Sequence, residues 1–184
     1  MSMSRLLRAT RACTFVIVSA CAVASPDASP SPQRSGDSTR VVVEGEFSNI
    51  RYTEEHAYGQ SVQLWRQGSR LLGLFMFTDG LQADFHTGLL EHVRFNSATG
   101  ELSFDAYASQ FHFEGRLEKA TINGVLKRIY PVEGRRVAED HVVLKRDVLL
   151  SDSLRDYASE DEWRNRYANE ILNRRGPPDK TERR

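Results

Sequence analysis

Apolar and polar side chains alternate with a period of two residues from Phe111 to Arg128. Such alternation is typical of antiparallel strands that bury one face. When the stretch is folded about Lys119 and Ala120, its apolar positions meet one another. The predicted pairs are Phe113 with Leu126, Gly115 with Gly124 and Leu117 with Ile122. The stretch therefore predicts a hairpin, with Asn123-Gly124 inside a strand although that dipeptide would also suit a turn.

Glycines punctuate the chain between Gly45 and Gly134, where ten of the twelve lie at intervals of 5 to 15 residues. They separate segments rich in Val, Ile, Leu, Phe and Tyr, which is the pattern of an antiparallel meander. Gly68-Ser69 and Asp79-Gly80 suit two-residue turns, and residues 96–100 suit a longer loop. Strands are expected near residues 40–53, 60–66, 71–78, 81–87, 89–95, 101–108, 111–118, 121–129 and 137–147.

The segment from Leu71 to Phe77 is apolar on both faces of its expected strand, so another element must cover the outer face. A C-terminal helix is the expected cover. Ser159 and Glu162 form a capping box at its start, and Gly176-Pro177-Pro178 mark its end. Its apolar stripe consists of Trp163, Tyr167, Ala168, Ile171 and Leu172. Docking on the sheet is the main interpretation, and binding to a partner protein or to a membrane surface are the alternatives.

Together these patterns predict a mainly β fold: an antiparallel meander forming a small up-and-down barrel or a curled sheet, with a C-terminal α-helix packed on it. The chain is long enough for one domain with a substantial core. The expected organisation is an export signal at 1–24, a disordered linker at 25–39, a barrel-like β domain at 40–150, a C-terminal helical segment at 151–176 and a charged tail at 177–184.

Residues 1–24 have the parts of an export signal: a basic start, a short apolar run and small residues at a cleavage point. Val18-Ser19-Ala20-Cys21 resembles the lipobox of bacterial lipoproteins, which implies a cut before Cys21 and a lipid anchor on its sulfur. An ordinary cut after Ala24 would instead give a soluble periplasmic or secreted protein. The expected location is the bacterial cell envelope, with the membrane as a partner if Cys21 is lipidated. A cytosolic protein with a fortuitous apolar start is the remaining alternative.

Charge and cysteine content narrow the range of functions. The chain has 25 basic and 25 acidic side chains, but Arg5, Arg8 and Arg11 lie in the export signal, so the rest is mildly acidic. Nucleic-acid binding needs a clustered positive surface and is not expected. Cys13 and Cys21 are removed or lipidated in this interpretation, which leaves no disulfide, thiol nucleophile or cysteine metal site.

The sequence contains no motif typical of catalysis. The five histidines lack a metal-binding spacing: His112 and Glu114 share a strand face, as do Asp84 and His86, but a third ligand would have to come from elsewhere. Glu54-Glu55-His56 lies in an expected loop. The chain has neither a nucleophile elbow nor a phosphate-binding glycine loop. We therefore expect no catalytic residue, no metal and no cofactor.

Gly45-Glu46-Phe47-Ser48-Asn49 resembles the Gly-x-Trp-x-Asn opening of avidin-like and related calycin barrels, with Phe47 in the place of the tryptophan. The resemblance implies an eight-stranded barrel with a ligand mouth, and it makes Asn49 a candidate for lining that mouth. The tryptophans that wall an avidin site have no counterparts in this chain apart from Trp65, so biotin binding is not implied.

The apolar strand faces would line the interior of a barrel, where a pocket would suit an apolar ligand such as an acyl chain. Alternatively, these side chains simply fill a small barrel. They are Leu102, Phe104, Phe111, Phe113, Leu117, Ile122 and Leu126. Our interpretation is a non-catalytic envelope protein whose β domain binds an apolar small molecule or an envelope protein.

Two other functions stay open at this point. One is a pure interaction or inhibitor module that uses exposed Trp65 and Tyr107 and holds no internal ligand. The other is an envelope hydrolase, which would be favoured if His86, His92, His112 or His141 lay close to carboxylates in the folded chain.

Overall fold

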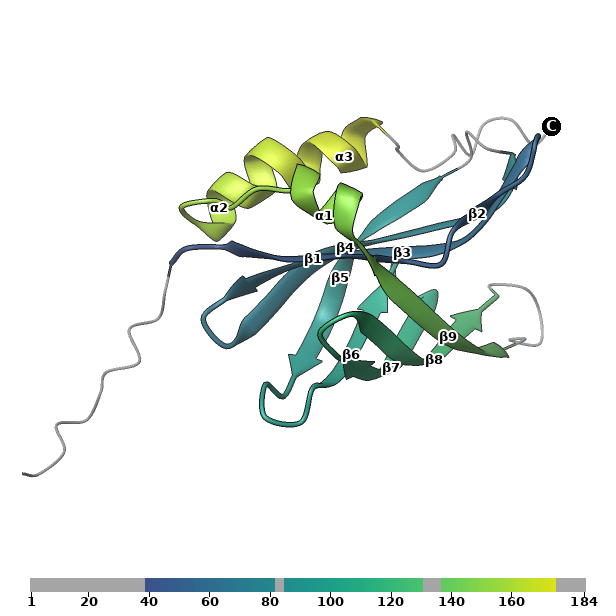
Figure 1. Cartoon of the computed structure of the whole chain (residues 1–184), viewed down its shortest axis with the longest axis horizontal. Helices are drawn as coiled ribbons and strands as arrows, with labels where there is room; N and C mark the ends of the chain where they lie inside the picture. Colours follow the sequence, from purple (N-terminus) through teal and green to yellow (C-terminus); the bar gives the residue numbers. More distant parts are fainter. Residues whose placement is uncertain (1–38, 82–84, 131–136, 175–184) are drawn as a thin grey trace, which may run out of the picture. The chain divides into compact units, whose positions relative to one another are not determined.

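The computed structural model describes residues 39–81, 85–130 and 137–174, which all belong to one compact unit, Ser35–Arg184. Their strands form a single antiparallel sheet (Figure 1). The strands are β1 (Val42–Ser48), β2 (Arg51–Tyr52), β3 (His56–Gln67), β4 (Arg70–Leu81), β5 (His86–Phe95), β6 (Glu101–Ala106), β7 (Phe111–Leu117), β8 (Thr121–Ile129) and β9 (Val137–Asp147). Because β1 pairs with both β9 and β3, eight strands close into a barrel, and short β2 lies beside β3.

The helices follow the last strand of the barrel. They are α1 (Val148–Ser153), α2 (Glu160–Trp163) and α3 (Asn169–Arg174), and a π-helical turn at Arg164–Ala168 joins the last two. Figure 1 shows them together on one side of the barrel. The fold class expected from the sequence is therefore confirmed: the protein is mainly β, with a closed barrel and a C-terminal helix packed on it.

The hairpin around Lys119 and Ala120 has the predicted register. All three predicted pairs are present, and Asn123-Gly124 lies inside β8. Gly115 and Gly124 are required because a Cβ at Gly115 would collide with the backbone carbonyl of Asn123, and one at Gly124 with that of Glu114. Either Cβ would also lie 2.7 Å from Cζ of Phe113. The ring of Phe113 thus fills the space above the two glycines.

The turns predicted from glycine-containing dipeptides and loops can be compared with the structure. Gly68 forms the β3–β4 turn with a positive φ of 57°, and the loop at 96–100 is present as expected. The turn predicted at Asp79-Gly80 is wrong, because β4 runs on to Leu81. Asp79 and Gly80 pair with β3, and Arg128 of β8 binds the Asp79 carboxylate at 2.8 Å. These long-range partners override the local preference for a turn.

Other strand limits also differ from the expectation. The strand expected at 40–53 is divided into β1 and β2, and the strand expected at 60–66 extends over 56–67. The separate strands expected at 81–87 and 89–95 are replaced by the end of β4 and by β5. Helical structure begins at Val148 rather than at 151.

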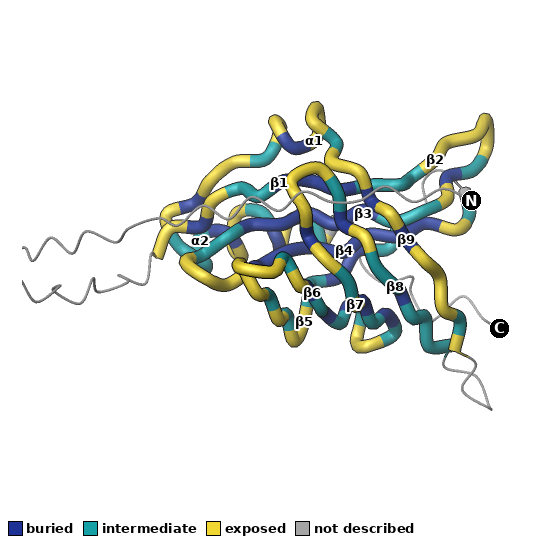
Figure 2. Tube along the Cα trace, turned by 60° about the horizontal axis from the view of Figure 1, so that its bottom comes forward, coloured by how far each residue is buried: buried dark blue, intermediate teal, exposed yellow. Residues whose placement is uncertain are grey.

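Aromatic and aliphatic side chains fill the interior of the barrel, and all seven side chains expected to line it are buried there. Phe111 lies between Phe75 and Phe77, with ring centroids at 5.0 and 4.6 Å, and Phe104 stacks on Phe113 at 5.0 Å. Figure 2 shows these buried positions running along the strands. The ring contacts account for the burial that holds the barrel closed.

A second apolar cluster joins the helices to the outer face of the barrel. Trp65 of β3 packs on Trp163 and Tyr167, with ring centroids at 5.5 and 5.1 Å. Leu72 and Leu74 of β4 belong to the same cluster. Docking of the helix on the sheet is thus confirmed, and it explains why both faces of β4 are apolar. Trp65 is fully buried, so the expectation that it is exposed is wrong.

The predicted cap is present at the start of α2, but the Glu162 carboxylate binds the amide one residue before Ser159 rather than that of Ser159 itself. The Ser159 hydroxyl accepts a hydrogen bond from the Glu162 amide at 3.2 Å, and the Glu162 carboxylate accepts one from the Ala158 amide at 2.8 Å. The π-helical turn inserts an extra residue, which brings Trp163 and Ala168, five residues apart, into the same buried cluster. The expected end at 176–178 lies outside the described residues.

Candidate functional site

A groove of about 300 Å³ lies between the outer face of the barrel and helices α1 and α3. Most of its wall is apolar, and two carboxylates and two neutral polar side chains complete it. Its lining residues are Glu46, Ser48, Ile50, Tyr52, Gln63, Met76, Phe85, Asp147, Leu150 and Ile171. The groove therefore combines an apolar surface with concentrated negative charge.

Glu46 is the most deeply buried charged residue of the groove, with 3% of its surface exposed. Its carboxylate accepts hydrogen bonds from the Ser61 hydroxyl at 2.7 Å and from the Gln63 amide at 2.8 Å. The β1–β3 register places Gln63 directly opposite Glu46. The Tyr167 hydroxyl donates to the Gln63 side-chain oxygen at 3.0 Å and so fixes the orientation of the amide. This network links the π-helical turn that contains Tyr167 to strands β1 and β3.

Helix α1 is attached to strand β1. The backbone amide of Glu46 donates to the buried Ser151 hydroxyl at 2.9 Å. Asp147, the register partner of Glu46 on β9, caps α1 by accepting a hydrogen bond from the Leu150 amide at 3.0 Å. The register thus brings two carboxylates opposite each other at one end of the groove.

The groove also borders exposed apolar side chains of α1. Val148, Leu149 and Leu150 are 62%, 84% and 45% exposed, and we call these three residues the α1 apolar surface. Tyr52 of β2, which lines the groove, is largely exposed as well. Adjacent exposed apolar side chains beside a groove are typical of a binding surface rather than of an isolated surface residue.

A second cluster of titratable side chains lies on the outer face of β5–β7, away from the groove. Asp105 contacts Nδ1 of His92 at 2.9 Å and Nδ1 of His112 at 2.6 Å. Nε2 of His112 lies 3.3 Å from Glu114. The hydrogen bond between His112 and Asp105 lowers the pKa of Asp105 and raises the pKa of His112. Two of the histidines named from the sequence are therefore brought together with carboxylates.

The contacts of this cluster favour an ion-pair network over a catalytic site. Both nitrogens of His112 contact carboxylates, so neither is directed at a hydroxyl that it could activate. Within the described part of the chain, no group of three or more His, Cys, Asp or Glu side chains is arranged to hold a metal ion. The cluster can bind protons and attract charged groups.

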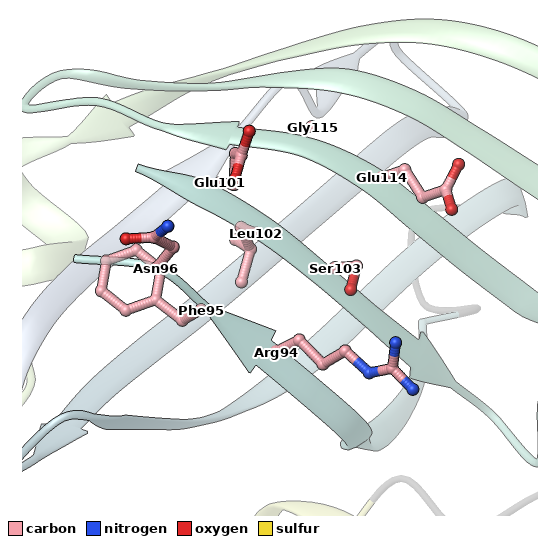
Figure 3. Close-up of a pocket in the computed structure, with 8 residues that line it drawn as sticks. All are labelled: Arg94, Phe95, Asn96, Glu101, Leu102, Ser103, Glu114 and Gly115. Atoms are coloured by element: carbon pink, nitrogen blue, oxygen red, sulfur yellow. The ribbon is translucent and has the colours of Figure 1, made fainter. Parts of the chain in front are cut away.

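An open hollow of about 560 Å³ adjoins this cluster through Glu114. Figure 3 shows that its side chains come from β5, β6 and β7 and from the turn that follows β5. They are Arg94, Phe95, Asn96, Glu101, Leu102, Ser103, Glu114 and Gly115. Basic, acidic and neutral polar groups are mixed here, so the hollow does not select one ligand charge.

Arg128 lies at one end of the barrel interior, against three aromatic rings. Its guanidinium carbon lies 5.2 Å from the ring of Phe77, 5.4 Å from Phe111 and 4.9 Å from Tyr130. Asp79 neutralises it at 2.8 Å. Arg128 therefore lies over the aromatic interior at this end of the barrel.

Asn49, the candidate from the calycin resemblance, has a structural contact. Its side-chain oxygen accepts a hydrogen bond from the Gln60 amide at 2.8 Å and so holds the turn after β1.

Tyr107, Ala108 and Ser109 have positive φ angles of 56°, 52° and 60° in the turn before β7. Left-handed backbone costs roughly 1–2 kcal/mol for each non-glycine residue, so this turn is strained.

Other residues named from the sequence contribute less. Glu54 and Glu55 are exposed in the turn before β3, and His141 is exposed on β9. Cys21 and Asp84 lie outside the described residues. Glu46 and Gln63 were not predicted as site residues from the sequence. They lie opposite each other on neighbouring strands, and this becomes visible only once β1 is paired with β3.

Comparisons with family models, curated proteins and solved structures found no match to this chain. The architecture, an eight-stranded antiparallel barrel with one extra strand and a C-terminal helix, is consistent with a calycin-like fold. None of the helices in the described ranges has the length and apolar character needed to cross a membrane.

Proposed function

We propose that this protein is a non-catalytic module of the bacterial cell envelope, anchored through a lipid on Cys21, and that it binds an envelope protein through the α1 apolar surface and the adjacent groove. The observation that carries the proposal is the exposure of Val148, Leu149 and Leu150 beside a barrel whose interior is packed with its own side chains.

The packing of the barrel supports a protein partner over an internal apolar ligand. An acyl chain inside the barrel would have to displace rings such as Phe75, Phe111 and Phe113, which contact their neighbours closely. A protein segment on α1 would displace only water. The alternative is a calycin-like barrel that takes a ligand at its mouth. At the rings of Phe77 and Phe111, such a ligand would compete with the guanidinium of Arg128.

Site-specific photocrosslinking in bacterial cells tests the binding surface. A photoreactive phenylalanine at Leu149 should give one reproducible crosslinked envelope protein, and the same residue at exposed Val143 of β9 should not. Leu149→Asp should abolish the complex when the identified partner and this protein are purified together. A crosslinking pattern that is the same at the two positions would contradict the proposal.

Intact mass tests the anchor. Protein purified from membranes of a bacterial host should begin at Cys21 and carry the mass of added acyl groups, and Cys21→Ser should lose both the mass and the membrane association. A mass that begins at Ser25 in the soluble fraction would contradict lipidation and would indicate an ordinary secreted module.

A further inference from the structure

We infer that the groove between α1, α3 and the barrel is a binding site for a cationic side chain, an arginine or lysine of the partner protein, with Glu46 and Asp147 as its counter-ions. This inference rests on the proposed function and adds the chemistry of the partner segment. Glu46 also joins β1 to β3 through Ser61 and Gln63, but neither carboxylate belongs to the apolar cluster of the interior.

The first argument is the unbalanced charge of Glu46. A carboxylate removed from water is normally paired with a cation, because its desolvation is costly. Within the described residues, the hydrogen-bond donors to the Glu46 side chain are the neutral groups of Ser61 and Gln63. They hold its two oxygens in a fixed position without neutralising them. A cation that enters the groove would supply the missing charge.

The second argument is the juxtaposition of like charges. Glu46 and Asp147 are directly opposite in the β1–β9 register, and both line the groove. Like charges in cross-strand pairs destabilise a sheet, and a cation between them would remove the repulsion. The adjacent Arg146 does not fill this role. Its guanidinium lies against Gly45, and its register partner is Phe47 of the barrel interior.

The third argument is the shape of the wall. Apolar side chains from the strands and from both helices surround the carboxylates, including Met76, Leu150 and Ile171. Arginine and lysine bury their methylene stems along apolar surface while the charged head is paired. The exposed α1 apolar surface would then contact apolar residues next to the basic one. A basic residue flanked by apolar residues is the segment that fits.

Binding of n-butylguanidinium to the full chain, followed by amide and methyl NMR shifts, tests the inference. The probe should shift signals of Gln63, Met76 and Ile171 saturably, and its affinity should fall with added salt. The neutral analogue n-butylurea should bind at least about tenfold more weakly, because it cannot pair with the carboxylates.

Matched variants locate the charge requirement. Glu46→Gln keeps the size and polarity of the side chain and should weaken n-butylguanidinium at least about tenfold. Asp147→Asn keeps a good helix cap and should weaken it less. Glu139→Gln removes an exposed carboxylate elsewhere on the barrel and should change nothing. Equal binding of the guanidinium and the urea, or unchanged binding to Glu46→Gln, would overturn the inference.

Two further outcomes separate this inference from the proposed function. If Leu149→Asp abolishes the partner complex while Glu46→Gln leaves it unchanged, the protein binds a partner but the cationic subsite is wrong. If n-butylguanidinium binds through Glu46 while Leu149 captures no partner, the proposed function fails and the cation site stands. Removal of residues 175–184, which include Lys180 and Arg183, should not change probe affinity. A higher probe affinity after this removal would mean that the chain's own tail occupies the groove, and it would contradict binding of a partner segment.

Discussion

The interior of the barrel is filled by apolar side chains, whereas the groove on its outer face combines an apolar wall with two carboxylates. Rings and aliphatic chains pack against one another in the interior, and Arg128, which lies over the rings of Phe77 and Phe111, is paired with Asp79. In the groove, by contrast, the buried carboxylate of Glu46 accepts hydrogen bonds from the neutral side chains of Ser61 and Gln63. Packing explains the interior as a source of stability, whereas burial of a carboxylate without a cation is costly and is what the proposed cation site would account for.

The interior should show the largest response to mutation. Phe113→Ala should lower the free energy of unfolding by about 3–5 kcal/mol, because it leaves a cavity between Phe104 and the paired glycines 115 and 124. Equilibrium unfolding in urea measures the change.

The matched control for this prediction is Tyr58→Ala, which removes an aromatic side chain of β3 that is 47% exposed. That variant should cost under about 1 kcal/mol. Similar losses for Phe113→Ala and Tyr58→Ala would contradict a densely packed interior.

Beside the groove, mutations should lower stability by removing hydrogen bonds rather than by leaving cavities. Ser151→Ala removes the acceptor of the buried Glu46 amide and should cost about 1–3 kcal/mol, although it deletes a single atom. Amide hydrogen exchange of Glu46 should accelerate in step. Ser153→Ala is the control, because its hydroxyl is exposed and donates only within α1. An unchanged exchange rate at Glu46 would contradict the link between α1 and β1.

The two regions also differ in how far the sequence predicts them. The register of the 111–128 hairpin is readable because its apolar positions are symmetric about the turn, and helix docking is readable because Leu71–Phe77 is apolar on both faces. Each signal is contained in one continuous segment. Local patterning therefore predicts the interior and the cover of the outer face.

The groove was not predictable in this way. The contact of Glu46 with Ser61 and Gln63 depends on the pairing of β1 with β3, and its link to Ser151 joins residues 105 positions apart. Local rules also failed at Asp79-Gly80, where partners on other strands keep the dipeptide extended. Both failures occur where distant parts of the chain decide the structure.

Helix α2, which packs on Trp65 through Trp163, allows a smaller test. Ser159→Ala removes the cap of α2 and should cost about 1 kcal/mol, while the Trp65–Trp163 contact keeps the helix docked. Thermal unfolding measures the loss, and Ser159→Asp should restore most of it because Asp is also a good cap. If Ser159→Ala also releases the helix, seen as solvent exposure of the tryptophans, then the cap rather than the apolar cluster holds it.

The smallest effect belongs to the exposed charges of β6 and β7, which contrast with the buried charge of the groove. The pKa of His112 is raised above its ordinary value of 6.5 by Asp105, so the stability from this pair is fully present below pH 6.5 and is lost as the pH rises through the folded-state pKa. The pKa of Asp105 is lowered from 3.8, so the same stability is also lost in strong acid.

His112→Asn should therefore reduce stability most between about pH 4 and pH 6.5, by less than about 1 kcal/mol because the pair is partly exposed. Urea unfolding at a series of pH values, with His141→Asn as the exposed control, measures the difference. A loss that is the same at pH 5 and pH 9 would mean that His112 stabilises β7 by packing and not by its charge.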